Sequence, residues 1–186
     1  APNFEENARR PSRYVAQPEN AELKIPKGFS INLFADTSMF DQRSYPRMMA
    51  QAPNGDVFVS DSRISRILVF RDKNGNGKAD ERFVFTEKVI QPFGLAFHDG
   101  YLYVGNTDSV VRFKYKNAQT AATGEGEKII DLPGKGYNQH WTRNLVVSPD
   151  GKKLFVTVGS KTNVSVEPDP RRAAISVYDI DGKNHR

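Results

Sequence analysis

One short segment of the chain gathers the residue types that binding and catalytic sites use: His140, Trp141, Thr142 and Arg143. It stands directly before the apolar run Leu145–Val147, which predicts a short strand. A histidine can take or give a proton near neutral pH. An arginine presents a planar fork of N–H groups to a carboxylate. The segment therefore indicates either a proton-transfer site for an anionic ligand or a hydrogen-bonded polar strand end.

A second polar segment has the oxygen spacing of a calcium loop. Oxygen side chains occupy its first, third, fifth and ninth places, namely Asp72, Asn74, Asn76 and Asp80. Gly77, at the sixth place, permits the sharp turn that lets such side chains converge on one hard cation. The twelfth place, where a bidentate Glu is usual, is Phe83, and Asn-Gly is also a favoured hairpin turn. A structural Ca²⁺ site and a polar hairpin turn are both compatible with this pattern.

The strands that position these segments recur along the chain. Residues 46–70, 92–113 and 142–160 each read as an apolar strand, a glycine-containing turn, a second apolar strand and a polar link. Further strand candidates follow each copy, at residues 82–86, 128–132 and 175–180. Four short strands every ~40 to 50 residues are typical of a β-propeller blade. The sequence therefore predicts an all-β protein, a β-propeller of four-stranded blades with about three blades present.

Two domains are expected. Residues 1–27 are polar with scattered prolines and predict an extended N-terminal arm, and residues 28–186 predict a partial β-propeller domain. The alternation of Phe29, Ile31 and Leu33 with polar residues predicts a half-buried first strand. Three blades alone would leave open apolar faces and unpaired edges. We therefore expect the N-terminal half of a longer protein, or pairing with a second chain, and the sequence predicts no closing strand at the C-terminal end.

Composition narrows the function classes. The chain has 186 residues, no cysteine and a net charge of +5 carried by dispersed Lys and Arg. There is no basic stripe of helical spacing, which argues against nucleic-acid binding. No apolar run approaches the ~18 residues of a membrane helix. The chain opens at Ala1 rather than Met, which is compatible with a processed, secreted or periplasmic protein.

In a propeller the first strand of each blade lines the central channel, so the residues just before those strands should converge in space. In the three copies they are Arg47, residues 91–93 and residues 140–143. A histidine, two arginines and a glutamine around one axis suit a polar, anionic ligand.

Three stretches carry a family resemblance: PRMMAQAPNGDVFVSD, PFGLAFHDGYLYVGNTDSVVRF and YNQHWTRNLVVSPDGKKLFVTVGS. With them, residues 28–186 resemble the N-terminal half of the glucose/sorbosone dehydrogenase family. The similarity is greatest to the sorbosone-dehydrogenase-like branch. The resemblance implies a soluble six-bladed propeller that uses pyrroloquinoline quinone (PQQ) and Ca²⁺, in which Ca²⁺ polarises the quinone and arginines stabilise the reduced cofactor.

The resemblance also implies roles for single residues. His140, five residues before Leu145, matches the family's general base, and Arg143 beside it is expected to be catalytic. Residues expected at the cofactor or substrate are Arg47, Gln91, Asn144, Ser160 and Asn163. The chain departs from the glucose enzymes where they have Gly-Arg-Leu and Asp-Gln. Here those places hold Arg143-Asn144-Leu145 and Ser160-Lys161. The first departure bears on the role of Arg143, and the second argues against glucose itself as substrate.

The expected activity is hydride transfer from an aldose or aldehyde to the quinone, with an electron acceptor such as a cytochrome as partner. The family's arginine clamp and calcium ligands lie in later blades, so the chain alone is expected to be inactive. A non-enzymatic propeller that binds a protein or glycan partner is the alternative. A lactonase-type metal hydrolase would need a carboxylate-rich centre, and Arg47, Gln91 and His140 do not supply one.

Overall fold

The computed structural model describes residues 26–136, 138–164 and 166–186. The chain divides into two compact units, Ala1–Asn32 and Leu33–Arg186. All regular elements of the described residues lie in the second unit. The expected N-terminal arm, residues 1–27, falls almost entirely outside the described residues.

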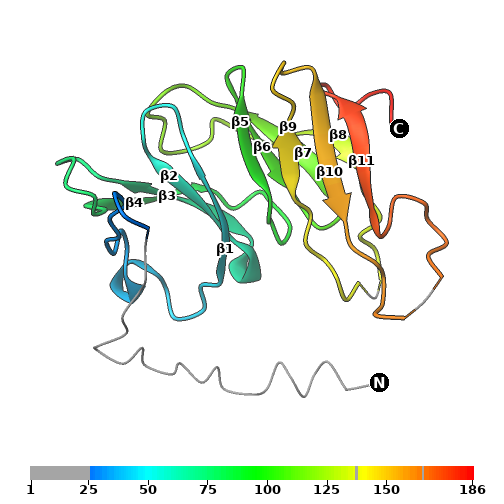
Figure 1. Cartoon of the computed structure of the whole chain (residues 1–186), viewed down its shortest axis with the longest axis horizontal. Coiled ribbons are helices and arrows are strands. Elements are labelled where there is room, and N and C mark those ends of the chain that lie inside the picture. Colours follow the sequence, from blue (N-terminus) through cyan, green and yellow to red (C-terminus); the bar gives the residue numbers. More distant parts are fainter. Residues whose placement is uncertain (1–25, 137, 165) are drawn as a thin grey trace. The chain divides into compact units, whose positions relative to one another are not determined.

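Within Leu33–Arg186 the strands form three antiparallel sheets that follow one another along the chain (Figure 1). The first consists of β1 (Pro46–Gln51), β2 (Val57–Asp61), β3 (Arg66–Arg71) and β4 (Glu81–Thr86). The second consists of β5 (Leu95–His98), β6 (Tyr101–Gly105), β7 (Ser109–Lys114) and β8 (Glu127–Asp131). The third consists of β9 (Leu145–Val147), β10 (Lys153–Val158) and β11 (Ala174–Asp179). The only helical elements in the described part of the chain are two 3₁₀ turns, η1 (Thr37–Met39) and η2 (Ser62–Ile64).

This architecture confirms the prediction of an all-β chain built from propeller blades, of which two have four strands and the third has three. In every sheet the strands lie in sequence order, so each blade is a simple antiparallel meander. The first two strands of each blade are joined by a turn with a glycine at positive φ: Gly55 at 94°, Gly100 at 72° and Gly151 at 71°. These conformations suit glycine because it has no Cβ. The recurring glycine of the sequence pattern is thus explained by the turn.

The third blade carries a further segment on its outer edge. Val177 and Arg186 exchange two backbone hydrogen bonds, of 3.0 and 2.9 Å, and the N–H of Asp179 donates to the carbonyl of Lys183 at 2.8 Å. Residues 183–186 therefore lie along β11 in the place that β4 and β8 hold in the other blades. The tight turn at Gly182 folds the chain back onto β11, but residues 183–186 form no strand, so no fourth strand closes this sheet, as the sequence predicted.

Two apolar cores hold neighbouring blades together. Between the first and second sheets, the ring of Phe58 packs edge-on against Phe97 at 4.9 Å and Tyr115 at 5.5 Å between centroids. Between the second and third sheets, Tyr103 and Val110 pack with Leu154 and other aliphatic residues. Strand β6 contributes to both cores, because alternate side chains point to opposite faces of a sheet. Middle strands that are buried on both faces read as continuous apolar runs, which made them visible in the sequence.

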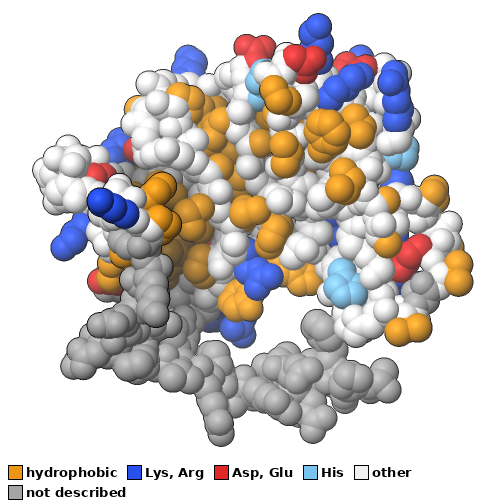
Figure 2. Space-filling model, in the orientation of Figure 1, with side chains coloured by type: hydrophobic (Ala, Val, Ile, Leu, Met, Phe, Trp, Pro, Cys, Tyr) orange, Lys and Arg blue, Asp and Glu red, His pale blue; other side chains and the backbone are white. Residues whose placement is uncertain are grey.

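The first strands β1, β5 and β9 are neighbours in space. Hydrophobic side chains are visible over this part of the surface in Figure 2, and Met49 on β1 and Val146 on β9 are exposed. The same strands bring the segments that precede them to one end of the three sheets.

The predicted strand at Phe29–Leu33 was wrong. Phe29, Ile31 and Leu33 are 72%, 59% and 67% exposed, and residues 28–33 form no strand. Alternation of apolar and polar residues stabilises a strand only where a neighbouring strand pairs with its backbone and a core covers its apolar face. Neither is present for this segment among the described residues. No helix in the described part of the chain is long and apolar enough to span a bilayer.

Candidate functional site

Residues from the starts of all three blades meet around the side chain of Arg47. Its guanidinium carbon lies 5.0 Å from the ring centroid of Tyr45, 5.8 Å from that of Phe93 and 5.7 Å from that of Trp141. The rings of Phe93 and Trp141 are themselves in edge-to-face contact, with centroids 6.2 Å apart. Arg47 donates from Nη1 to the hydroxyl of Tyr45 at 3.2 Å and forms no ion pair with a described carboxylate. An exposed cation held by aromatic faces is thus available to an anionic ligand.

His140, next to Trp141, is half-buried and held through one ring nitrogen. Its Nδ1 lies 3.0 Å from the carbonyl oxygen of Ser160 and 3.0 Å from the hydroxyl of the same residue. The hydroxyl of Ser160 donates in turn to the carbonyl of Thr162 at 2.8 Å. Because a carbonyl only accepts, Nδ1 carries the proton in this arrangement.

The other ring nitrogen of His140, Nε2, is left without a proton. A neutral imidazole that is protonated on Nδ1 has its lone pair on Nε2. No described group bonds to Nε2, so it is available as a proton acceptor. The contact with Ser160 therefore selects the tautomer that a general base requires.

The backbone that carries His140 is clamped by glycines of two blades. The N–H of Gly94 donates to the carbonyl of Arg143 at 2.9 Å. A Cβ at Gly94 or Gly105 would meet that carbonyl oxygen at 2.7 or 2.5 Å, and a Cβ at Gly159 would meet the Cβ of His140 at 2.5 Å. Real Cβ atoms do not approach other atoms this closely, so glycine is needed at all three positions. The second blade and the end of β10 thus fix the segment 140–143 from both sides.

Arg143 lies beneath this surface rather than in it. Its side chain is fully buried, and its guanidinium donates to the carbonyls of His140 at 2.8 Å, Thr142 at 3.0 Å and Pro133 at 2.9 Å. Burial, and then the charge of Arg172, lower the pKa of Arg143 to about 10. The guanidinium is therefore still charged at neutral pH. Direct contact with a ligand at the surface, as the sequence suggested, does not fit this burial, and the contacts are those of a residue that holds the His140 segment in place.

The other expected ligand contacts are dispersed. Gln91 is exposed, has φ of 43° and donates from its backbone N–H to Ser65 at 3.1 Å. Asn144 joins the third blade: its N–H donates to the hydroxyl of Thr157 at 3.1 Å. Ser160 contacts His140, as described, and Asn163 is exposed. The structure thus brings Arg47 and Ser160 to the residues around His140 and Trp141, and records no contact of Gln91 or Asn163 with them.

The loop from Asp72 to Asp80 is closed by its own hydrogen bonds. The carboxylate of Asp72 accepts from four consecutive backbone N–H groups, those of residues 74–77, at 2.7 to 3.2 Å. Burial acts to raise the pKa of Asp72, but these four bonds outweigh it and hold the pKa below its usual value. Asp80 accepts from the N–H of Lys73 at 2.7 Å and from the amide of Asn74 at 2.8 Å.

Asn76 is engaged in the same way, because its side-chain oxygen accepts from the N–H of Lys78 at 2.9 Å. The side-chain oxygens of Asp72, Asn76 and Asp80 are thus bonded to donors of the loop itself. No cluster of three or more His, Asp or Glu residues suited to a metal occurs among the described residues. The loop geometry fits the hairpin-turn interpretation better than the Ca²⁺ site.

Together the surface residues offer a defined chemistry. Flat rings at Phe93 and Trp141 can stack on a planar or cyclic ligand. Arg47 can bind a carboxylate, and Nε2 of His140 can accept a proton from a hydroxyl placed beside it. Tyr45 had no sequence signal of its own, because it precedes the first repeat and is recognised only by its contact with Arg47.

Comparison with known proteins places this fold. The profile of the TrAA12-like family matches residues 23–185. The PQQ domain of pyranose dehydrogenase from Coprinopsis cinerea, in its holo form, superposes with a TM-score of 0.64 at 20% identity, covering 77% of this chain and 35% of that one. A calcium structure of a family AA12 carbohydrate-active enzyme from Trichoderma reesei gives 0.60 at 20% identity, with 74% and 36% covered.

A bacterial protein shares the fold as well. The PQQ-bound aldose sugar dehydrogenase from Streptomyces coelicolor has a TM-score of 0.57 at 19% identity, with 74% of this chain and 45% of that one covered. The chain therefore spans between 35% and 45% of the length of these three structures. No curated protein matches the sequence.

Proposed function

Because the chain belongs to the TrAA12-like family, whose profile covers residues 23–185, we propose that the protein is a PQQ-dependent sugar or aldehyde dehydrogenase. His140 is its general base. The observation that carries the proposal is the contact of Nδ1 with Ser160, which leaves Nε2 as the open lone pair at the start of the third blade.

The residues around His140 suit the proposed cofactor. PQQ is a planar quinone with three carboxylates, and it would accept hydride when bound. The rings of Phe93 and Trp141 are suited to its plane, and Arg47, with no carboxylate partner among the described residues, is suited to one of its carboxylates.

His140 takes the proton from the hydroxyl of the sugar as the C–H bond of the same carbon breaks. Ser160 holds the imidazole in the required tautomer, a device that fixes both the ring orientation and its basicity. Arg143 acts as a positioning residue, since it binds the carbonyls of His140 and Thr142 from below. Gly159 allows the imidazole to lie against the end of β10.

Several finer assignments belong to this proposal. They are the sorbosone-like branch, roles of Gln91, Asn144 and Asn163 at the ligand, a calcium ion at the quinone, an acceptor such as a cytochrome, and a periplasmic or secreted location. The calcium is supported by the calcium structure of the T. reesei protein, but no described residue of this chain is assigned to it. The likeness to longer proteins supports inactivity of the chain by itself.

The test is a titration of PQQ in the presence of Ca²⁺ into protein expressed from the whole reading frame, followed by a panel of aldoses and aldehydes. Reduction is read from the absorbance of the cofactor. A general base contributes ~10² to 10⁴ in rate, so His140→Ala should lower turnover by about that factor while PQQ still binds.

His185→Ala is the matched control, because His185 stacks on Tyr178 and bonds to Ser176, away from the residues described above. It should reduce the cofactor at the normal rate. Full activity of His140→Ala would remove the base assignment. Absence of PQQ binding to the wild type would instead favour the alternative, a propeller that binds a protein or glycan.

A further inference from the structure

Two buried arginines beneath the His140 segment lack carboxylate partners. Arg143 is 0% exposed and Arg172 is 7% exposed. Both donate through Nη2 to the carbonyl of Pro133, at 2.9 and 2.7 Å. Among the described residues neither forms an ion pair, and Nε of Arg143 has no hydrogen-bond partner.

Such an arrangement is costly. Each ion taken out of water loses several kcal/mol of solvation, and only an opposite charge restores it. Carbonyl oxygens satisfy N–H donors but do not neutralise the charge. Asp108 raises the pKa of Arg143 yet forms no ion pair with it, and Asp169 is paired with Arg171 at 2.7 Å. Two further carboxylates lie nearby: Glu167 accepts from the N–H of Lys161 at 2.7 Å, and Asp169 interacts electrostatically with Arg172. The positive charge at this place is therefore only partly compensated by the protein.

A cavity of about 540 Å³ opens directly beside Arg172. Its charged lining residues are Lys128, Lys135, Lys161, Arg172, Asp108 and Asp131. Lys128 and Asp131 neutralise each other at 2.7 Å. That leaves three cations and one carboxylate, and neither Lys135 nor Lys161 forms an ion pair with a described residue. A carboxylate-sized anion would meet an excess of positive charge here.

The cavity adjoins the candidate site. It lies at the ends of β8 and β10, the same end of the sheets at which β5 and β9 begin. The N–H of Gln139, next to His140, donates to the carbonyl of Lys161 at 3.1 Å, and Arg143 binds the carbonyl of Pro133. Two walls of the cavity are thus bonded to the segment that carries His140.

We propose that this cavity binds the carboxylate of an acidic sugar, a uronic acid unit, presented next to His140. The inference rests on the proposed function, because a sugar hydroxyl must reach Nε2 of His140. Arg172 uses two of its N–H groups on Asn138 and Pro133, and a guanidinium has five.

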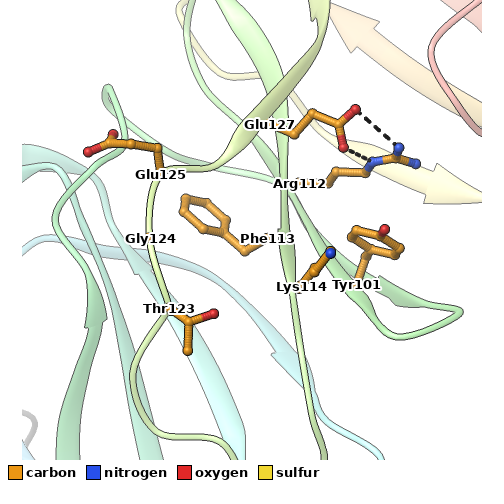
Figure 3. Close-up of a pocket in the computed structure, with 8 residues that line it drawn as sticks. All are labelled: Tyr101, Arg112, Phe113, Lys114, Thr123, Gly124, Glu125 and Glu127. Atoms are coloured by element: carbon orange, nitrogen blue, oxygen red, sulfur yellow. Dashed lines mark hydrogen bonds and ion pairs between the residues drawn. The ribbon is translucent and has the colours of Figure 1, made fainter.

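A second cavity shows the contrast (Figure 3). It is smaller, about 150 Å³, and lies at the opposite end of the second blade. Its arginine, Arg112, is bound by both oxygens of Glu127 at 2.8 and 3.3 Å and lies over the ring of Tyr101. The charge of Arg112 is therefore already neutralised, and it would not attract an anion into this cavity.

The experiment measures binding of glucuronate and of glucose to the protein from the whole reading frame, by calorimetry and by the shift of the thermal midpoint. Ligand that binds only the folded state raises the midpoint. We expect glucuronate to bind at least tenfold more tightly than glucose. The double variant Lys135→Gln/Lys161→Gln should lose that preference, and Lys114→Gln, in the cavity of Figure 3, should keep it.

Arg172→Gln is informative only if the variant folds, so the two exposed lysines carry the test. Equal affinity for both sugars, or an unchanged preference in the double variant, overturns the proposal. So does binding of inorganic phosphate as tight as that of glucuronate, because the cavity would then lack selectivity for a sugar. If saturating PQQ displaces glucuronate, and the lysine variants weaken PQQ instead, the carboxylate belongs to the cofactor and the substrate assignment fails.

The outcome is separable from that of the proposed function. Reduction of bound PQQ by glucose and other neutral aldoses, but not by glucuronate, would sustain the dehydrogenase and overturn this inference. Glucuronate binding that depends on the two lysines, in a protein that never binds PQQ, would sustain this inference and overturn the dehydrogenase.

Discussion

The first and third blades differ in the partners of their buried and half-buried arginines. In the first blade Arg66 bonds to Asp61 at 3.0 Å, and Arg71 bonds to both oxygens of Asp56 at 2.9 and 2.6 Å. In the third blade Arg143 and Arg172 face carbonyl oxygens only. The charge of a paired arginine is compensated within the fold. An arginine that faces only neutral acceptors keeps an uncompensated charge, which attracts an anion from outside. The difference separates the buried arginine pairs inside the first blade from the uncompensated arginines beneath the His140 segment.

The largest expected change in unfolding free energy comes from replacing one arginine in each blade by methionine. Arg66→Met leaves Asp61, which is 0% exposed, without its cation, and should lower the free energy of unfolding by about 3 to 5 kcal/mol. Arg143→Met strands no carboxylate and removes donors from three carbonyls, one of which Arg172 still serves. Its cost should be about 2 kcal/mol.

Urea unfolding followed by circular dichroism gives both values. Equal losses would mean that Arg143 is paired as tightly as Arg66, and the contrast between the blades would fail.

Acid pH should lower the free energy of unfolding by a smaller amount. Arg171, unlike its neighbour Arg172, is paired with a carboxylate, and this pair is lost when the carboxylate is protonated. Hydrogen bonds from Arg171 lower the pKa of Asp169 from 3.8 to about 2. Since the unfolded chain takes up this proton first, the contribution is complete above about pH 4 and is lost as the pH falls through 2. For this partly exposed pair it should amount to about 1 kcal/mol after solvent screening.

The measurement is the unfolding free energy at pH 5, 3 and 2 for the wild type and Asp169→Asn. The wild type should lose about 1 kcal/mol more than the variant over this range. Parallel curves would show that Asp169 and Arg171 do not interact in solution.

The smallest effect is expected at the surface of the first blade. Lys73 and Glu81 pair at 2.9 Å with side chains 58% and 32% exposed. Exposed pairs contribute little, so Glu81→Gln should change the unfolding free energy by less than about 0.5 kcal/mol. A loss as large as that of Arg66→Met would mean that burial is not what distinguishes the pairs.

The strands could be predicted from the sequence because their determinants are local. Apolar runs such as Ile67–Phe70 and the glycines of the hairpin turns can be recognised from a few consecutive residues. The same was true of the polar segment 140–143, whose place at a strand start follows from the repeat. The segment 28–33 shows the limit of local patterns. Its alternation of apolar and polar residues can be seen in the sequence, but the presence of a partner strand cannot.

The roles within the candidate site could not be predicted, because they depend on contacts between blades. Nothing near Arg143 in the sequence indicates that Gly94 and Gly105 approach its carbonyl, or that its side chain is fully buried. Arg172 had no signal either, since its relation to Arg143 passes through Pro133, 39 residues away in the chain. Conversely, the spacing of Asp72 and Asp80 suggested a metal, while backbone N–H groups of the loop and the side-chain amide of Asn74 bond to those oxygens.

Trp141 is the only tryptophan of the 186 residues, and it lies against Phe93 and the cation of Arg47. The indole emission of this chain therefore comes from a single place, the candidate site. Its intensity and wavelength report on the polarity and charge beside His140, with no label and no background from the rest of the fold. The chain thus carries its own optical probe for whatever binds at the starts of the three blades.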